Sequence, residues 1–411
     1  MRRITLSCLF VLTSIFSFAQ ADSSIKPLSV RDTIRLQKYE SDTADQRDMI
    51  DVLVKIFKPK HFNRAKLKPG ETSFFILPGI YYSKPTGIAG TISSTLAYLP
   101  SDYKYQNLST VFSTLSYAQH QQKTFSVYST LWTKKNNFSF QGVAWYFDYS
   151  ESTYGRGSNS QNEKENVLDY RFARFYESVL KQIYPDVFIG VGYKLDYHFN
   201  IIEHGNKDGS ISDISTYSGK GKTISSGPSI DFLFDDRRNQ INPRRGSFVN
   251  LVYSPKLQSL GSDDNWQFFK VDLRKYFKLS PNSNNLLALW SLSQFTFGKA
   301  PYLDLPATEW DDLQKTGRGY LQGRFRGKNM LYFESEFRFK ITHNGVLGGV
   351  AFANAETFTE PLTNSFGKLL PAAGAGIRIK LNKYTRTNLS LDYGIGLNGS
   401  SGVFFNIGEV F

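Results

Sequence analysis

Cysteine is almost absent from this sequence of 411 residues, and the single example is Cys8. It lies in an N-terminal stretch in which two arginines are followed by an uncharged apolar run over residues 4–18. A basic start, a short apolar run and small residues before the cleavage point are typical of a secretory signal peptide, which we predict at residues 1–19. Its removal leaves a chain without cysteine, which excludes disulfide bonds and thiolate sites.

Long hydrophobic runs are absent as well. Beyond residue 19, no segment has the roughly 18 continuous apolar residues that a membrane-spanning helix requires. Nevertheless, 15% of the residues are aromatic, with 34 Phe and 24 Tyr, although the mean hydropathy is only −0.35. Membrane-spanning β-strands account for both observations, because lipid-facing and lumen-facing residues alternate along each strand and average to a polar chain.

Histidine is scarce, and the sequence has no recognisable catalytic or metal-binding motif. The histidines beyond the predicted signal peptide are scattered: His61, His120, His198, His204 and His343. No His-x-x-x-His pair and no phosphate-cradling glycine loop occurs. A lipase would need serine, histidine and an acid converging at the membrane rim, and nothing in the sequence singles out such a set. We therefore expect no enzymatic activity, no metal site and no cofactor.

Basic residues are in surplus: 49 Lys and Arg against 36 Asp and Glu give a net charge of +13. A basic protein that binds nucleic acid clusters its cations around a recognition motif. Here the cations are spread along the chain and interleave with acidic residues. We therefore expect no nucleic-acid partner, and we assign the surplus to the lumen and rim of a barrel that lies in anionic outer-membrane lipid.

Residues 20–72 are predicted to form a periplasmic linker with one short helix. The segment 46–58 reads QRDMIDVLVKIFK, with apolar residues mostly at helical spacing, and Pro59 ends it. We expect this helix to lie apart from the barrel wall.

From residue 73 to residue 411 the pattern has a period of two, which predicts an all-β, transmembrane antiparallel β-barrel. Around Asp392, for example, Leu391 and Tyr393 share one face, and polar residues share the other. A shift of one residue would place charges in lipid, so the register is well specified. The predicted strands, an even number as bacterial single-chain barrels require, are 73–82, 86–98, 108–119, 123–134, 137–149, 166–181, 186–199, 223–235, 246–256, 264–279, 285–298, 330–341, 346–356, 368–380, 387–397 and 402–411.

The predicted connections alternate in length. Tight turns such as 342–345 fall at one end of the strands, which we assign to the periplasm together with the N-terminus. The long connections fall at the other end, which we assign to the outside of the cell: 150–165, 200–222, 299–329 and 357–367. The predicted location is therefore the outer membrane of the cell.

The longest connection, 299–329, contains Gly317-Arg318-Gly319-Tyr320. This sequence resembles the Arg-Gly-Phe/Tyr motif in the sixth extracellular loop of the BamA/TamA-type outer-membrane barrels (the bacterial surface antigen superfamily). In that family the loop folds back into the lumen, and its arginine rests against acidic residues of the wall. Glycines on both sides of Arg318 would let the loop turn tightly against the wall.

The strand after this loop carries Glu334 and Glu336 in a pattern that looks like the family's Glu-x-Arg strand. A buried guanidinium needs a carboxylate partner, so we predict that Arg318 pairs with Glu336, with Glu334 and Asp392 as alternatives. The following strand has Asn354 where the family usually has aspartate. This departure removes one charge partner, although the amide oxygen could accept a hydrogen bond from Arg318.

The end of the sequence resembles the C-terminal signal by which outer-membrane barrels in general are recognised for insertion. Phe405, Ile407 and Phe411 carry this resemblance within the predicted last strand, 402–411.

The seam between the first and last strands is predicted to be the weakest pairing of the wall. Pro78 donates no backbone hydrogen bond and Gly79 weakens the interior of the first strand, while Gly408 can kink the last one. The alternative is that Pro78 sits at a bulge that an edge strand tolerates, and that the seam closes normally.

The resemblance implies a short form of the family without its tandem periplasmic domains, since residues 20–72 are too few for one of them. Such a barrel would assist the insertion of outer-membrane proteins, or translocate a protein or lipid client, through a seam whose exposed edge templates a client strand. The alternative is a passive channel or surface receptor with the loop folded into its lumen. A frayed seam with a plugged lumen favours the first, and a paired seam with an open lumen the second. The sequence specifies neither the client nor the oligomeric state.

Overall fold

The computed structural model of the protein describes residues 46–57, 69–83, 87–102, 106–217, 221–237, 239–280, 285–383 and 385–411. The predicted signal peptide and most of the predicted linker lie outside these residues.

Sixteen β-strands make up most of the described residues, and each predicted strand is present. The largest difference is in β7, which continues to Asn206 instead of ending at residue 199. Within the described stretches, no helix is long and apolar enough to cross a membrane. The strands are β1 (Thr72–Ser83), β2 (Gly87–Tyr98), β3 (Ser109–Ala118), β4 (Lys123–Trp132), β5 (Phe138–Thr153), β6 (Asn166–Tyr184), β7 (Val187–Asn206), β8 (Lys222–Asp235), β9 (Gly246–Lys256), β10 (Trp266–Lys278), β11 (Leu286–Gly298), β12 (Asn329–Lys340), β13 (Leu347–Phe358), β14 (Leu370–Asn382), β15 (Thr387–Ile395) and β16 (Ser401–Ile407), and the α-helices among the described residues are α3 (Met49–Phe57) and α4 (Asp213–Tyr217).

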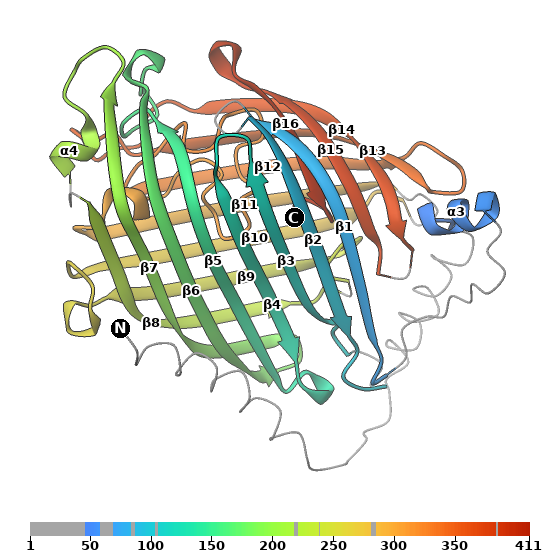
Figure 1. The fold of residues 1–411 in the computed structure, drawn as a ribbon. Helices are drawn as coiled ribbons and strands as arrows, with labels where there is room; N and C mark the ends of the chain where they lie inside the picture. The colour runs from blue at the N-terminus through green and yellow to red at the C-terminus, as the bar shows by residue number, and fades with distance from the viewer. Residues whose placement is uncertain are drawn as a thin grey trace. The chain divides into compact units, whose positions relative to one another are not determined.

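The strands form one antiparallel sheet in which each strand pairs with the next along the chain, from β1 to β16 (Figure 1). The sheet curls until its two outermost strands meet: the ring of Phe405 in β16 lies 3.8 Å from the position that a Cβ atom on Gly79 in β1 would occupy. Within the described residues, however, no backbone pairing joins β1 to β16. The protein is a transmembrane antiparallel β-barrel, as predicted, and no ladder of backbone hydrogen bonds between described residues closes its seam.

Side chains alternate between the two faces of this sheet. In β12, Glu334 and Glu336 are fully buried on the inner face, whereas Phe333 is 50% exposed on the outer face. In β15, Asp392 is buried and Tyr393 is half exposed. Charges inside and apolar side chains outside are the arrangement of a membrane barrel, because lipid replaces water around the outer face.

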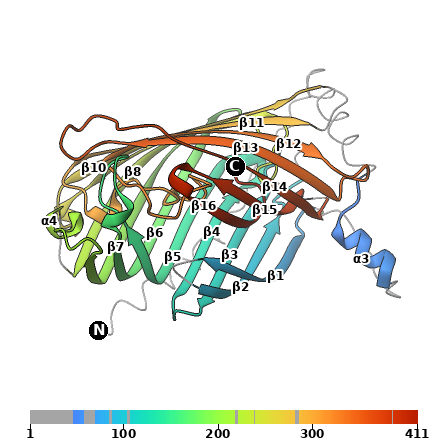
Figure 2. The same cartoon turned by 90° about the horizontal axis from the view of Figure 1, so that it is seen from above.

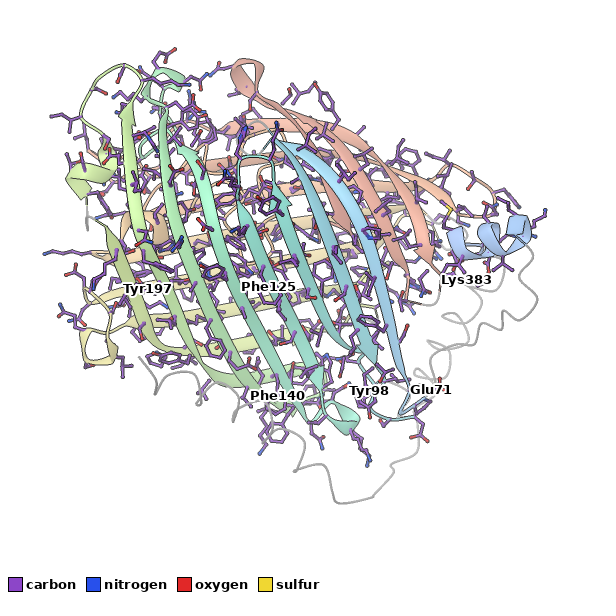
Figure 3. All side chains as sticks on the ribbon, in the orientation of Figure 1. Glu71, Tyr98, Phe125, Phe140, Tyr197 and Lys383 are labelled. Carbon is purple, nitrogen blue, oxygen red and sulfur yellow. The ribbon has the colours of Figure 1, made fainter. Side chains whose placement is uncertain are left out.

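The connections define two ends of the barrel, which we call the turn end and the loop end. Connections at the turn end are mostly short, and Figure 3 shows Tyr98 and Phe140 toward this end of the wall. The loop end carries the long connections 154–165, 299–328 and 359–369. Short turns at one end and long loops at the other are typical of outer-membrane barrels.

The last strand is shorter than predicted, because β16 ends at Ile407 rather than continuing to Phe411. Gly408 has a φ of +101°, which is a left-handed conformation that glycine adopts readily. Beyond it the chain turns into the lumen, where the end of the chain is visible in both views (Figures 1 and 2). Phe411 is buried there, with its ring 5.2 Å from that of Trp290 in β11. The prediction that Phe411 lies in the strand was therefore wrong.

The helix predicted at 46–58 is present as α3, but it does not lie apart from the wall. Asp48 accepts a hydrogen bond of 2.7 Å from the Lys383 backbone N–H, and Asp51 accepts one of 2.8 Å from Lys383 Nζ. Gln46 accepts one of 2.5 Å from Lys380 Nζ in β14. Figure 3 shows Lys383 beside α3. Polar groups at the start of the helix thus tie it to the turn end of the last strands, which the apolar periodicity of the segment could not reveal.

Candidate functional site: the lumenal loop and the seam

Residues 299–328, between β11 and β12, fold into the barrel, and we call them the lumenal loop. Arg318, Tyr320, Phe325 and Arg326 are all buried, at 4% exposure or less. A loop of this length would normally run over the surface, because its backbone polar groups need partners. Here many of these groups bond to one another within the loop, as in the bond from the Thr308 N–H to the Phe325 carbonyl, and the barrel wall supplies further partners.

Arg318 is the anchor of the lumenal loop on β12 and β15. Its Nη2 atom donates to Glu334 and, over 2.6 Å, to Glu336, and its Nη1 atom donates to Asp392 over 2.5 Å. The guanidinium also lies over the ring of Phe352 in β13, 3.7 Å from its centroid. The structure therefore brings Arg318 together with Glu336, the predicted partner, and with both alternatives, Glu334 and Asp392.

The glycines of the motif make this close approach possible. Gly317 and Gly319 have φ values of +72° and +117°, which other residues rarely adopt. A Cβ atom on Gly319 would lie 2.7 Å from the Cβ atom of Ala372 in β14. Tyr320 completes the motif by donating from its hydroxyl to the carbonyl of Pro371 over 2.6 Å and accepting from the backbone N–H of Leu397 over 3.1 Å.

Asn354 binds the loop as a hydrogen-bond donor, whereas its amide oxygen was expected to accept from the Arg318 side chain. Its amide nitrogen donates a hydrogen bond of 2.9 Å to the backbone carbonyl of Arg318, and no hydrogen bond connects its oxygen to the guanidinium. An ionised aspartate at this position could not donate such a bond. The departure from the family pattern thus replaces a charge partner by a clamp on the main chain of the loop.

The ionic network extends from Arg318 to the inward-turned end of the chain. Arg378 donates to Asp392 over 2.5 Å and to Glu409 over 2.7 Å. Arg338 donates to the main-chain oxygen of Phe411 over 2.8 Å, and Lys315 of the lumenal loop donates to the backbone carbonyl of Glu409 over 2.7 Å. The loop, the last strands and the C-terminal residues therefore share one set of buried charges. Separating one partner of such a network costs several kcal/mol, because it leaves a buried charge uncompensated.

The same loop is also fixed to β5 and β10 by residues that the sequence did not single out. Arg326 donates to Glu151 in β5 over 2.6 Å, and Asp312 accepts from Lys270 in β10 over 2.5 Å. Burial lowers the pKa of Lys315, also in the loop, to about 8, which leaves it charged at neutral pH. The lumenal loop is thus fixed at both sides of the lumen and lies across it. Arg324 and Arg326, two further arginines in the predicted connection 299–329, were the signal in the sequence that could have indicated contacts of the loop with acidic residues of the wall.

The residues predicted at the seam are on β1 and just after β16. Pro78 and Gly79 pair with Ile92 and Thr91 of β2, on the only side of β1 that has a backbone neighbour among the described residues. The residues of the predicted C-terminal signal are divided between the two faces: Phe405 is 37% exposed on the outer face, Ile407 ends β16, and Phe411 is 4% exposed in the lumen.

No protein-family model matches the sequence, and no curated protein matches it. Solved structures do share its fold. BamA from Haemophilus ducreyi lacking POTRA domains 1–3 is similar with a TM-score of 0.51 and 13% identity, over 82% of this chain and 69% of that chain. CdiB from Escherichia coli has a TM-score of 0.53 and 10% identity, over 82% and 62%. CdiB from Acinetobacter baumannii has a TM-score of 0.54 and 11% identity, over 82% and 59%, so this chain spans less than two thirds of either CdiB chain. The chain therefore has the fold of the BamA and CdiB outer-membrane barrels, the type that the motif of the lumenal loop predicted.

Proposed function

We propose that the protein resides in the outer membrane with its N-terminal segment in the periplasm, and that it assists the insertion of outer-membrane proteins or the translocation of a protein or lipid client. The observation that carries this proposal is the combination of an unpaired seam with a lumen crossed by a fixed loop.

The seam supplies a strand edge. β1 has twelve residues, and its backbone groups that face away from β2 have no strand partner among the described residues. Such an edge accepts a further strand through main-chain hydrogen bonds. Pro78 offers no donor of its own, so a strand held there would be released more readily than from a complete ladder. An unfolded client strand can therefore be templated at β1 without any covalent step.

The lumen supports this function over the alternative of a passive channel. The lumenal loop reaches Glu336 of β12 on one side and Glu151 of β5 on the other, over 2.6 Å in both cases. Val410 and Phe411 fill further space beside Trp290. A wide water-filled pore would require both segments to leave, at the expense of several buried ion pairs.

The purified protein in liposomes tests the proposal, with a small urea-unfolded outer-membrane barrel as the client. We expect the client to reach its heat-resistant folded form faster than in empty liposomes, and the protein to show no large stable openings in planar bilayers. Unchanged folding of the client together with large stable conductance would replace this proposal by the channel.

A further inference from the structure

A carboxylate lies on the outer face of the wall, where lipid is expected. Glu177 in β6 is flanked along its own face by Phe175 and Val179, which are 46% and 38% exposed, whereas its strand neighbours Tyr176 and Ser178 belong to the inner face. Within the described residues, the Glu177 side chain has no hydrogen bond or ion pair. Ionisable side chains that face lipid are rare because they are costly to maintain, which makes an unpaired one a functional candidate.

The pairing of β5 with β6 places Glu177 near the middle of the membrane. One exposed ion pair, Asp148 with Arg171, marks the water boundary toward the loop end, and Lys181 beside Phe138 marks the boundary toward the turn end. Roughly ten residues separate the two rows, which at about 3.3 Å per residue and about 45° of tilt corresponds to about 23 Å, the height of the apolar band of a barrel. Glu177 lies between them, too deep for a lipid headgroup to reach.

A notch surrounds this carboxylate. Ser129, Gly142 and Glu177 are direct neighbours across β4, β5 and β6. A Cβ atom on Gly142 would lie 2.5 Å from Oε2 of Glu177 and 2.6 Å from Oγ of Ser129, so both polar groups lean over the glycine. Ala144 follows on the same face of β5, and Ala173, which pairs with Tyr146, lies further along β6. Small residues around polar groups let a second membrane segment approach closely and hydrogen-bond.

We propose that this notch, formed by Ser129, Gly142, Ala144 and Glu177, is the contact between two copies of the protein in the membrane. Two barrels of the same orientation are related by a two-fold axis along the membrane normal, and a residue close to that axis meets its own copy. A protonated carboxyl group is self-complementary, since it offers one donor and one acceptor to another carboxyl group. Pairing Glu177 with its copy therefore removes the unpaired group from lipid without requiring a second charge.

The position of the notch fits this occupant better than a client. It lies on β4–β6, several strands away from the seam at β1 and β16. A dimer formed through β4–β6 would leave both seams open, and the inference does not depend on the proposed function.

Cysteine crosslinking in proteoliposomes tests the dimer while Glu177 is retained. Cys8 is replaced by serine in every variant. We expect Ala144→Cys to give a disulfide-linked dimer, and Leu273→Cys, an outer-face residue of β10 that is 41% exposed, to give none. Adding Glu177→Val to Ala144→Cys should reduce crosslinking by about tenfold, whereas Glu177→Gln should retain most of it, because two amides also pair.

The heat-modifiable gel shift verifies that each variant is folded, and photobleaching counts the subunits of the wild-type protein independently. Single-step bleaching at all protein-to-lipid ratios, or equal crosslinking at residues 144 and 273, would overturn the proposal. Crosslinking of residue 144 to a protein of another mass in native membranes would overturn the assignment to a second copy.

Discussion

The inner face of the wall differs between its last strands and its first. β12 and β15 present fully buried acids to Arg318, and the resulting ion pairs include the lumenal loop. β2 and β3 instead present hydroxyl groups to one another: Ser116 donates to Thr91 over 3.0 Å. Hydroxyl pairs contribute only about 1 kcal/mol each, far less than it costs to separate a buried ion pair. The seam therefore has a rigid side at β16 and a compliant side at β1, and we expect opening to occur by movement of β1.

The largest expected effect is on the rigid side. Arg318→Ala leaves Glu334, Glu336 and Asp392 buried without their central cation, and we expect a loss of about 3–5 kcal/mol in the free energy of unfolding. Urea titration of the heat-modifiable gel shift measures this loss, and limited proteolysis reports release of the lumenal loop. The control is Arg171→Ala, which removes an exposed ion pair and should change stability by at most about 1 kcal/mol. Equal stability of the two variants would contradict the claim that the ion pairs of Arg318 make the side of the seam at β16 rigid.

A smaller effect is expected from the backbone of the same loop. Gly319→Ala meets both the φ of +117° and the 2.7 Å approach to Ala372, so the loop must shift. We expect about 1–3 kcal/mol of destabilisation in the same titration. Gly399→Ala is the matched control, because Gly399 has a φ of +74° but no atom within 4 Å of its Cβ position. If Gly399→Ala destabilised the barrel more than Gly319→Ala, the close packing of Gly319 against Ala372 would not explain the loss of stability.

On the compliant side a single substitution should matter little. Ser116→Ala removes one hydroxyl pair, and we expect at most about 1 kcal/mol of destabilisation. Hydrogen exchange of the β1–β2 backbone should nevertheless be faster than that of β12–β13 in the unaltered protein, since the latter is supported by the ionic network. Equal protection of the two strand pairs would remove the basis for movement of β1.

The smallest effect concerns α3, which is attached at the turn end of the rigid side. Lys383→Ala removes a partly buried contact with Asp51, with side chains 22% and 26% exposed, and should change stability by about 0.2–1 kcal/mol. We also expect deletion of residues 20–57 to leave the heat-modifiable gel shift intact, because barrel stability comes from strand pairing. If the barrel failed to fold without these residues, the contacts of α3 with the wall would be required for folding, and the expectation would be wrong.

The part of this arrangement that could be predicted from the sequence is the part encoded locally. Alternation along β12 fixes which way Glu334 and Glu336 point, and the glycines around Arg318 indicate a tight turn, so the central ion pairs followed from neighbouring residues. The contact of Arg326 with Glu151 joins positions 175 residues apart, and no pattern along the chain connects them.

The end of the chain could not be predicted for a different reason. Phe405, Ile407 and Phe411 keep the period of two, and only Glu409 interrupts it. The φ of Gly408 redirects the backbone, and the burial of Phe411 against Trp290 and its hydrogen bond from Arg338 favour the lumen over the membrane. Likewise, the apolar residues of α3 predicted a helix, whereas its attachment depends on polar residues that bind the distant Lys380 and Lys383.

A covalent link across the seam tests most directly whether the free edge of β1 is needed for client folding. Gly79→Cys with Phe405→Cys, joined by a short bis-methanethiosulfonate crosslinker that forms a reducible disulfide with each cysteine, ties β1 to β16 at the point where the two strands approach. The control, Tyr393→Cys with Val403→Cys, ties β15 to β16, which are already paired. We predict that crosslinking the seam abolishes the acceleration of client folding in liposomes, and that reducing the crosslink, or using the control pair, preserves it. Full activity of the completely crosslinked seam would contradict the account, because a client strand would then have no edge on which to form.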